Sequence, residues 1–379
     1  MFPKLRFKEF DGDLTESKLV ELTSWASGGT PAKDVPEYWG DDIPLISGAS
    51  MHTNQLYESD VKITKLGLQK GSKLALKDSI LILVRGSMLF NKIPMGITLG
   101  DVAFNQDVKC IRPKQQLAPL FLFQWLHAKE NTIQNKVTAT GIGAGKLDTA
   151  DLQNLKLYKP SLEEQTKIAT FLSAVDEKIS QLTQKHQLLR EYKRGMMQKL
   201  FSQQVRFKAD DGSEFGEWDQ LKFKDVIKIK YGKDHKKLDD GDIPVLGTGG
   251  IMRYVDSYLY EGESILIGRK GTIDKPRFIS GKFWTVDTLF YTEIGEKILP
   301  KFAFQQLLLV NWLNLNEATG VPSLNTTSIG NIELKVPCLA EQTKIANVLS
   351  AIDQKIEVVS KQIEQAKQWK KGLLQQMFI

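Results

Sequence analysis

Cysteine and histidine are scarce in this sequence. It has two cysteines, Cys110 and Cys338, and four histidines in 379 residues. The cysteines lie far apart without CxxC spacing, and the histidines are scattered. This pattern argues against a disulfide framework and against a zinc site, and it is compatible with a reducing cytosol. We therefore expect no metal site.

Long apolar runs are missing too. No stretch approaches the ~18 consecutive apolar residues of a membrane span, and the first eight residues carry charge and lack an apolar signal core. Apolar and charged residues make up 41% and 25% of the chain, which is ordinary for a globular protein. A net charge of +6 suggests nucleic-acid binding only weakly. We expect a soluble, cytoplasmic protein with two domains or more.

The sequence does contain a close internal repeat. Glu164–Ile179 and Glu341–Ile356 lie 177 residues apart and are identical at 12 of 16 positions. A repeat this close, separated by a long unlike stretch, indicates one structural unit that is used twice. The segments between the copies should then carry the function.

Each copy opens a long amphipathic helix. Apolar residues recur at alternating steps of four and three, after Pro160 in one copy and Pro337 in the other. A single stripe of this kind would indicate an ordinary core helix. Two stripes in one register favour two helices of roughly 60 Å, residues 161–204 and 338–379, that pack antiparallel as a coiled coil. The predicted pairing seam consists of Ile168, Leu172, Val175, Ile179, Leu182, Leu189, Met196, Ile345, Leu349, Ile352, Ile356, Val359, Ile363 and Leu373.

The segments before the helices repeat more weakly. Leu5–Lys8 matches Val205–Lys208 at an offset of 200, so the first segment is longer by 200 − 177 = 23 residues. Short apolar runs such as Ser79–Val84 alternate with turn residues, which is typical of mixed α/β domains. We expect an α/β (α+β) protein with two such domains, residues 1–160 and 205–337. The two long helices should join them in a pseudo-twofold, cyclic arrangement with the chain ends close together.

This layout resembles the DNA-specificity subunit of type I restriction–modification enzymes. The resemblance spans the chain and rests on Glu-Gln-Thr-Lys-Ile-Ala at 164–169 and 341–346, on Leu-Arg-Phe-Lys-Glu-Phe at 5–10, and on the duplicated domains. It implies two target-recognition domains, each reading one half of a bipartite, asymmetric site in double-stranded DNA. The paired helices would set the spacer between the half-sites and dock two methyltransferase subunits.

The resemblance also implies that this chain has no catalytic activity of its own. Methyltransferase subunits would methylate adenine, and ATP-dependent restriction and translocase subunits can join them. S-adenosylmethionine, ATP and Mg would then bind only to partner subunits, and no membrane is involved. The length of each helix, roughly 60 Å, is an upper limit on the separation of the two half-sites. One turn of DNA is roughly 34 Å long.

A comparison of the two domains separates two classes of candidate DNA-binding residue. Shared features should be scaffold or phosphate contacts, and divergent features should carry specificity. A basic-Gly-hydroxyl turn is shared, and the cation and hydroxyl of each copy could bind phosphate, although an ordinary exposed turn is the alternative. These phosphate candidates are Arg85, Ser87, Lys270 and Thr272.

The divergent class centres on residues 47–78 and 247–263, where the lengths differ most. Asn and Gln pair with adenine, and Arg is the usual reader of guanine. The first domain offers Ser50, His52, Asn54 and Gln55; the second offers Thr248, Arg253, Tyr254, Arg269, Lys275 and Arg277. The run Lys233–Lys237 looks like a basic loop over the DNA backbone.

An enzyme and a non-DNA scaffold are the alternative interpretations. Gly141–Leu147 looks like a phosphate loop, but Thr140 stands where the first glycine belongs and Leu147 replaces the Ser/Thr, so we predict a plain turn. We find no Asn/Asp-Pro-Pro-aromatic methyltransferase motif and expect no catalytic residues. A coiled-coil scaffold that joins two non-DNA ligand-binding modules would explain the helices. It would not explain why the modules share a frame and vary in their loops.

Overall fold

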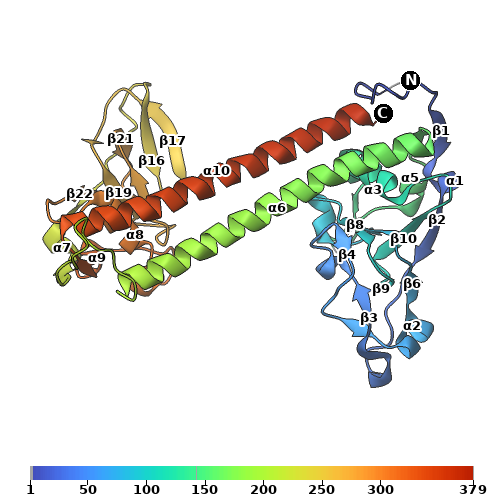
Figure 1. Cartoon of the computed structure of the whole chain (residues 1–379), viewed down its shortest axis with the longest axis horizontal. Helices are drawn as coiled ribbons and strands as arrows, with labels where there is room; N and C mark the ends of the chain where they lie inside the picture. The colour runs from blue at the N-terminus through green and yellow to red at the C-terminus, as the bar shows by residue number, and fades with distance from the viewer. Residues whose placement is uncertain (1–2, 142, 379) are drawn as a thin grey trace. The chain divides into compact units, whose positions relative to one another are not determined.

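The computed structural model describes residues 3–141 and 143–378, which form two compact units (Figure 1). The first unit comprises Met1–Thr183 and Lys361–Ile379, and the second comprises Gln184–Ser360. Two long helices, α6 (Leu162–Phe201) and α10 (Leu339–Met377), run through both units. Each unit thus combines one globular segment with part of each helix. The residue boundaries that we expected for the four segments stay a prediction.

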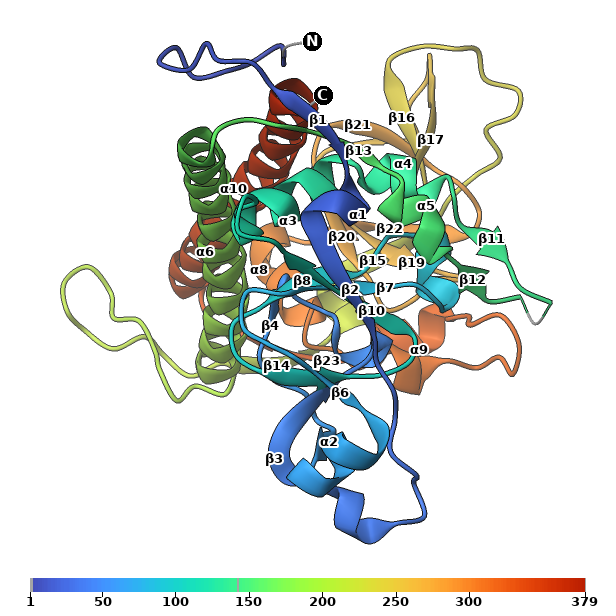
Figure 2. The ribbon, with the colours of Figure 1, turned by 90° about the vertical axis from the view of Figure 1, so that its right-hand side faces the viewer.

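The first unit packs small sheets and short helices around a main core and a second, small apolar cluster (Figure 2). Its larger sheets have the strand orders β2-β10-β7-β8-β4 and β5-β3-β9-β6, and β1 pairs with β13 and β11 with β12. The strands are β1 (Thr15–Lys18), β2 (Thr23–Ser27), β3 (Trp39–Ile46), β4 (Gln55–Leu56), β5 (Lys62–Ile63), β6 (Lys73–Ala75), β7 (Ile80–Leu83), β8 (Met95–Thr98), β9 (Val102–Phe104), β10 (Val108–Pro113), β11 (Thr138–Ala139), β12 (Gly145–Lys146) and β13 (Lys156–Lys159). The short helices are α1 (Leu19–Leu22), α2 (Lys65–Gly71), α3 (Pro119–Ala128), α4 (Glu130–Gln134) and α5 (Thr149–Gln153), with 3₁₀ turns η1 (Pro36–Tyr38), η2 (Gly48–Ser50) and η3 (Ser87–Phe90).

The second unit repeats this plan with fewer elements. Its sheets have the orders β15-β22-β19-β20 and β17-β16-β21-β18, and β14 pairs with β23. The strands are β14 (Asp219–Lys222), β15 (Ile227–Tyr231), β16 (Ile243–Gly247), β17 (Gly250–Val255), β18 (Tyr260–Glu261), β19 (Ser264–Gly268), β20 (Arg277–Ile279), β21 (Lys282–Thr285), β22 (Leu289–Ile294) and β23 (Glu333–Val336). The short helices are α7 (Phe223–Val226), α8 (Pro300–Leu307) and α9 (Thr326–Gly330), with the 3₁₀ turn η4 (Trp312–Leu315).

The duplicated apolar runs form equivalent central strands. Every residue of β7 and of β19 is buried, as expected for short β-rich runs that lie between two neighbouring strands. In both units the other four-stranded sheet contains a parallel strand pair, β3 with β9 or β16 with β21. The first unit alone carries β4 and α2, which fall in the region where the sequence has its extra residues.

Within each unit α6 and α10 pack antiparallel, as the heptad pattern predicts. In the first unit the start of α6 lies against the end of α10, and in the second unit the end of α6 lies against the start of α10. The predicted seam residues Ile168, Leu172, Val175, Leu182, Ile345, Leu349, Ile352, Val359 and Leu373 are buried, and Ile179, Leu189, Met196, Ile356 and Ile363 are half-buried. Among the described helices, none is both long and apolar enough to cross a membrane.

Glu164 and Gln165, the first two residues of the repeated motif, join three segments of the first unit by hydrogen bonds. Glu164, which is 3% exposed, accepts two hydrogen bonds from Arg6, at 2.7 Å from Nε and 2.8 Å from Nη2. Gln165 accepts a hydrogen bond from Ala118 N, the residue that caps α3, at 2.9 Å, and donates one to Pro160 O at 2.9 Å. These contacts tie the entry segment before β1, α3 and the start of α6 to one another.

The same contacts recur in the second unit with the equivalent residues. Arg206 donates to fully buried Glu341 at 3.1 Å from Nε and 2.7 Å from Nη2. Gln342 accepts from Leu299 N, the cap of α8, at 2.7 Å and donates to Pro337 O at 2.8 Å. The hydrogen bonds from Arg6 and Arg206 to their glutamates raise the pKa of both guanidinium groups. The near-identity of the two helix starts is therefore explained by the frame that they build.

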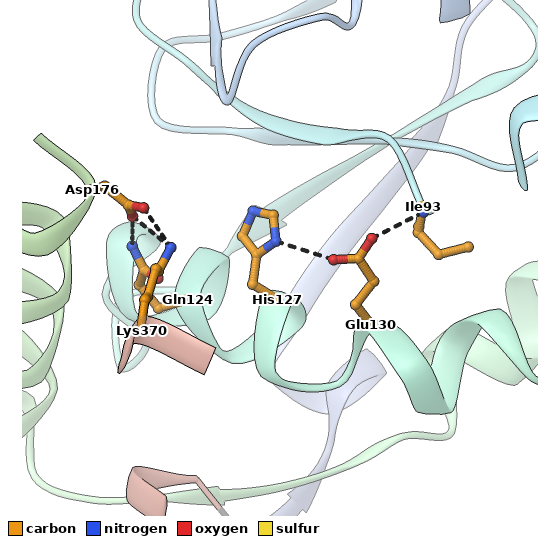
Figure 3. Close-up of polar contacts among 6 residues, drawn as sticks. All are labelled: Ile93, Gln124, His127, Glu130, Asp176 and Lys370. Atoms are coloured by element: carbon orange, nitrogen blue, oxygen red, sulfur yellow. Dashed lines mark hydrogen bonds and ion pairs between the residues drawn. The ribbon is translucent and has the colours of Figure 1, made fainter. Parts of the chain in front are cut away.

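A second repeated contact fixes each globular segment to both long helices. In the first unit Asp176 of α6 binds Lys370 of α10 at 2.6 Å and accepts from Gln124 of α3 at 2.8 Å (Figure 3). In the second unit the roles of the long helices exchange, and Asp353 of α10 binds Lys193 of α6 at 2.7 Å. The amide of Gln305 in α8 donates to the same aspartate at 2.9 Å. Equivalent lysines at polar seam positions thus specify the helix register.

The first unit has a further polar pair at the end of α3. His127 Nδ1 lies 3.6 Å from Glu130, and Glu130 accepts a hydrogen bond from Ile93 N at 3.1 Å (Figure 3). Burial acts to raise the pKa of the Glu130 carboxyl, but His127 and the Ile93 amide outweigh it, and the pKa lies below its ordinary value. This carboxylate secures the loop after η3 to α4.

The two ends of the chain meet in the first unit, as the cyclic layout predicts. Leu5 N donates to Gln376 O of α10 at 2.9 Å. At the equivalent place in the second unit, Val205 N donates to Lys199 O of α6 at 3.2 Å across a continuous stretch of chain. The entry segment thus bonds to the end of a long helix in both units.

The buried ion pair yields a stability prediction. Arg206→Ala should lower the free energy of unfolding of the second unit by about 3 kcal/mol, because it leaves the Glu341 carboxylate buried without its cation. Lys208→Ala is the matched control, since it removes an exposed ion pair with Glu214 and should leave stability almost unchanged. Hydrogen exchange at the start of α10 measures both, and equal protection in the two variants would show that the pair is not a structural support.

Candidate functional site

The shared basic-Gly-hydroxyl turn has a glycine at positive φ in both units. In the first unit Gly86 has φ +142°, and its N–H donates to Gly145 O at 2.9 Å. In the second unit Gly271 has φ +88°, and its N–H donates to Pro322 O at 2.9 Å. Positive φ favours glycine at both positions. The flanking candidates Arg85, Ser87, Lys270 and Thr272 are all exposed.

The segment from Gly141 to Leu147, for which we predicted a plain turn, lies beside this turn. β11 and β12 form a short hairpin there, and Leu147 N donates to Val84 O at 2.9 Å. Ile142 lies outside the described residues. The segment supports the shared turn and has no P-loop strand–helix context. In the described part of the chain, no group of three or more His, Cys, Asp or Glu residues is placed to hold a metal ion.

The base-reading candidates of the first unit lie in one stretch, in which Ser50 is half-buried. Ser50 exchanges hydrogen bonds with Ser47, at 2.9 Å from Ser47 N and 3.1 Å to Ser47 O. His52, Asn54 and Gln55 follow as exposed residues, and the backbone of this stretch joins the sheet through Ile97 N to Asn54 O at 2.9 Å. The structure thus presents their side chains to solvent next to β4.

Three candidates of the second unit gather at one cleft. Thr248 lines it directly. Arg269 donates from Nη1 to the carbonyl of Asp287 at 3.1 Å, and its guanidinium lies 5.4 Å from the centre of the Tyr231 ring. Arg277 donates from Nη2 to Gly247 O. Asp287 and Gly247 both line the same cleft, so the structure brings Thr248, Arg269 and Arg277 together.

The remaining candidates of the second unit make other contacts or are exposed. Arg253 of β17 forms an ion pair with Asp240 at 2.6 Å and donates to Leu238 O at 3.1 Å. Tyr254 is 50% exposed on the same strand, and Lys275 is exposed in the loop before β20. The contacts of Arg253 are those of a side chain that holds its neighbouring loop in place.

Each unit has a cleft that our sequence analysis did not find. The first has a volume of about 690 Å³, and the second has a volume of about 750 Å³. Polar lining residues of the first are Thr30, Lys33, Ser47, Asn105 and Gln106, and those of the second include Asp234, His235, Lys236, Thr248, Asp287 and Thr288. We call these the first cleft and the second cleft.

Only part of this lining had a sequence signal. The run Lys233–Lys237 contributes to the second cleft, and its composition had marked it as a basic loop. The turns at 105–108 and 286–289 had no such signal, because the two segments have no identical residue at equivalent positions. A comparison of the two domains by identical residues therefore does not detect these turns.

Comparisons with known proteins show the family of this chain. The family model described as "Type I restriction modification DNA specificity domain" matches residues 12–190 and 216–368. The specificity subunit of the type I restriction enzyme MjaVIII of Methanocaldococcus jannaschii is 27% identical, over 97% of this chain and 94% of that protein. The EcoprrI specificity subunit of Escherichia coli is 23% identical, over 88% of this chain and 86% of that protein.

The fold has a similar solved structure as well. The crystal structure of the type I restriction-modification S subunit from M. genitalium matches with a TM-score of 0.69 and 18% sequence identity, over 100% of this chain and 99% of that one. The family model matches once in each repeat and covers most of the chain. The chain belongs to the family of type I restriction modification DNA specificity domain proteins.

Proposed function

We propose that this chain is the DNA-specificity subunit of a type I restriction–modification system, and that each recognition domain reads one half of a bipartite, asymmetric site. The observation that carries the proposal is a frame with the same buried contacts in both units, which presents different side chains at equivalent places. Two unlike readers on one repeated frame suit two unlike half-sites. The alternative, a scaffold for non-DNA ligands, has no support among the relatives.

Catalysis in such a system belongs to the partner subunits. Adenine methylation with S-adenosylmethionine, and cleavage with ATP and Mg, would take place on methyltransferase and restriction subunits. The contribution of this chain is to bind double-stranded DNA, to select its sequence and to hold the partners. The shared turns support sequence-independent phosphate contacts, because each exposes a cation and a hydroxyl beside a glycine at positive φ.

The long helices suit two further roles. α6 has 40 residues, which gives a length of about 60 Å and exceeds the roughly 34 Å of one DNA turn. The helices also carry exposed apolar residues on one face each, because Leu188 and Tyr192 lie four residues apart and Val358 and Trp369 lie three turns apart. Tyr192 and Trp369 are equivalent in the repeat, and they are 56% and 55% exposed. Two equivalent aromatic anchors suit two copies of a methyltransferase subunit.

Methylation mapping tests the function and the spacer together. Genomic DNA from a host that contains the methyltransferase subunit should show a bipartite methylated motif only when this chain is present. Removal of one heptad from each helix in register should shorten the spacer by about three base pairs, because it removes about 10 Å of helix rise. A motif that is independent of the chain would contradict the proposed function, and an unchanged spacer would contradict only the role of the helices.

The shared turn yields a prediction on salt dependence. Lys270→Ala should weaken the binding of the assembled complex to specific and random DNA by the same factor, and should lower the slope of log K against log salt by about 1. Lys335→Ala removes an exposed cation of β23 and serves as the control. Binding titrations at several salt concentrations provide the measurement. A loss on specific DNA alone would mean that Lys270 reads bases.

The aromatic anchors yield a prediction on assembly. Tyr192→Ala together with Trp369→Ala should abolish stable binding of the methyltransferase subunits, and each single change should remove one copy, because each helix carries one anchor. Native mass spectrometry of the complex counts the copies. Arg194→Ala with Lys371→Ala is the control, since each residue is exposed and lies roughly 200° around its helix from the anchor. Full assembly of the aromatic double variant would refute this docking surface.

A further inference from the structure

The floor of each cleft is the same β-turn. In the first unit, Asn105 N donates to Ile46 O at 3.0 Å, and Val108 N closes the turn on Asn105 O at 3.3 Å. In the second unit, Val286 N donates to Leu246 O at 3.0 Å, and Leu289 N closes on Val286 O at 3.0 Å. The turns therefore match residue by residue.

The residues at the tips of the turns are consequently equivalent. Gln106 stands at the tip in the first cleft and Asp287 stands at the tip in the second, and both are exposed. The next residue of each turn is also fixed by a backbone contact, since Val84 N donates to Asp107 O and Arg269 N donates to Thr288 O, both at 2.8 Å. One backbone thus presents an amide in one unit and a carboxylate in the other.

The wall that faces the tip is equivalent as well. After β2 and β15 the chain passes so close to the next strand that only glycine fits, because a Cβ at Gly28 or Gly232 would collide with backbone carbonyl oxygens. One residue further on, Gly29 N donates to Phe104 O at 3.0 Å and Lys233 N donates to Thr285 O at 2.8 Å. The residues that follow, Thr30 and Asp234, therefore occupy the same place.

Tryptophan indoles secure both walls. Trp39 Nε1 donates to Ala32 O at 3.0 Å, and Trp284 Nε1 donates to Lys233 O at 2.9 Å. The two tryptophans come from different strands, β3 and β21. Each wall is thus pre-organised, which lowers the entropy cost of binding a ligand between wall and tip.

The chemistry at these equivalent places differs sharply. In the first cleft the Thr30 hydroxyl donates to Gln106 Oε1 at 2.7 Å, so the amide is held with its N–H₂ group and one oxygen lone pair available, the pattern that pairs with adenine. In the second cleft Asp234 and Asp287 replace this pair with two carboxylates, which only accept hydrogen bonds. Carboxylates repel phosphate, so a base with an amino group, such as cytosine, is the suitable ligand there rather than the DNA backbone.

We propose that the two clefts are the base-reading sites of the two recognition domains, and that Gln106 with Thr30 and Asp287 with Asp234 each select one base pair of their half-site. The inference rests on the proposed function. Arg269, which donates to the Asp287 carbonyl, and Arg277, which donates to Gly247 O, stand beside the second pair and can read neighbouring guanines.

The test uses the full complex with its methyltransferase subunits. Asp287→Asn keeps the side-chain shape but replaces an acceptor by a donor, so the preference at one base pair of the second half-site should fall or switch by about tenfold. The first half-site should be unchanged. Gln106→Glu should change the preference at one base pair of the first half-site and leave the second half-site unchanged. Binding to duplex libraries randomised in one half-site, together with methylation mapping, measures both effects.

Matched controls separate base reading from general damage. Asp219→Asn on β14 and Gln115→Glu before α3 make the same chemical changes at exposed positions and should leave the motif intact. Thr30→Val should alter the same base pair as Gln106→Glu, and Asp234→Asn should alter the same base pair as Asp287→Asn. A wild-type motif in all four cleft variants, or equal changes in both half-sites, would overturn the proposal. An absence of sequence-specific binding by the unaltered complex would instead refute the proposed function.

Discussion

Two buried ion pairs, Arg6 with Glu164 and Arg206 with Glu341, join each recognition domain to the start of a long helix, and the repeated frame depends on them. Glu164 and Glu341 are almost fully shielded from water, and each is held by an arginine that arrives from the start of its own recognition domain. A buried carboxylate without its cation is costly, so neither partner can change alone. This constraint explains why the helix starts remained nearly identical. It also explains how one repeated frame can hold two domains whose exposed loops differ.

The two domains can differ at positions where hydrogen bonds fix the backbone but the side chain is exposed. At the floor of each cleft the same hydrogen bonds hold the turn, and Gln106 and Asp287 project from its tip without a buried partner to satisfy. A substitution there costs the fold little, because both side chains are exposed and the hydrogen bond from Thr30 to Gln106 is itself exposed. In the proposed account, specificity can diverge at the tips while the frame and the shared basic-Gly-hydroxyl turns stay constant.

The repeat made the long helices, their antiparallel pairing and the meeting of the chain ends predictable, because heptads and offsets are local properties of sequence. The clefts were not predictable in this way. They form where strands distant in sequence pair, β3 with β9 and β16 with β21, and the turns between them have no identities to align. The ion pair of Arg253 with Asp240 also escaped notice, since composition alone does not reveal which cation already has a partner.

The central claim is that one frame presents two interchangeable readers. A chimaera in which residues 205–337 are replaced by residues 5–160 tests it most directly, because Leu5 and Val205 make the same contact with a helix end and both segments end at the proline before a long helix. Methylation mapping with the methyltransferase subunit present should then reveal two copies of the first half-site in opposite orientation. Retention of the original asymmetric motif by this chimaera would contradict the account.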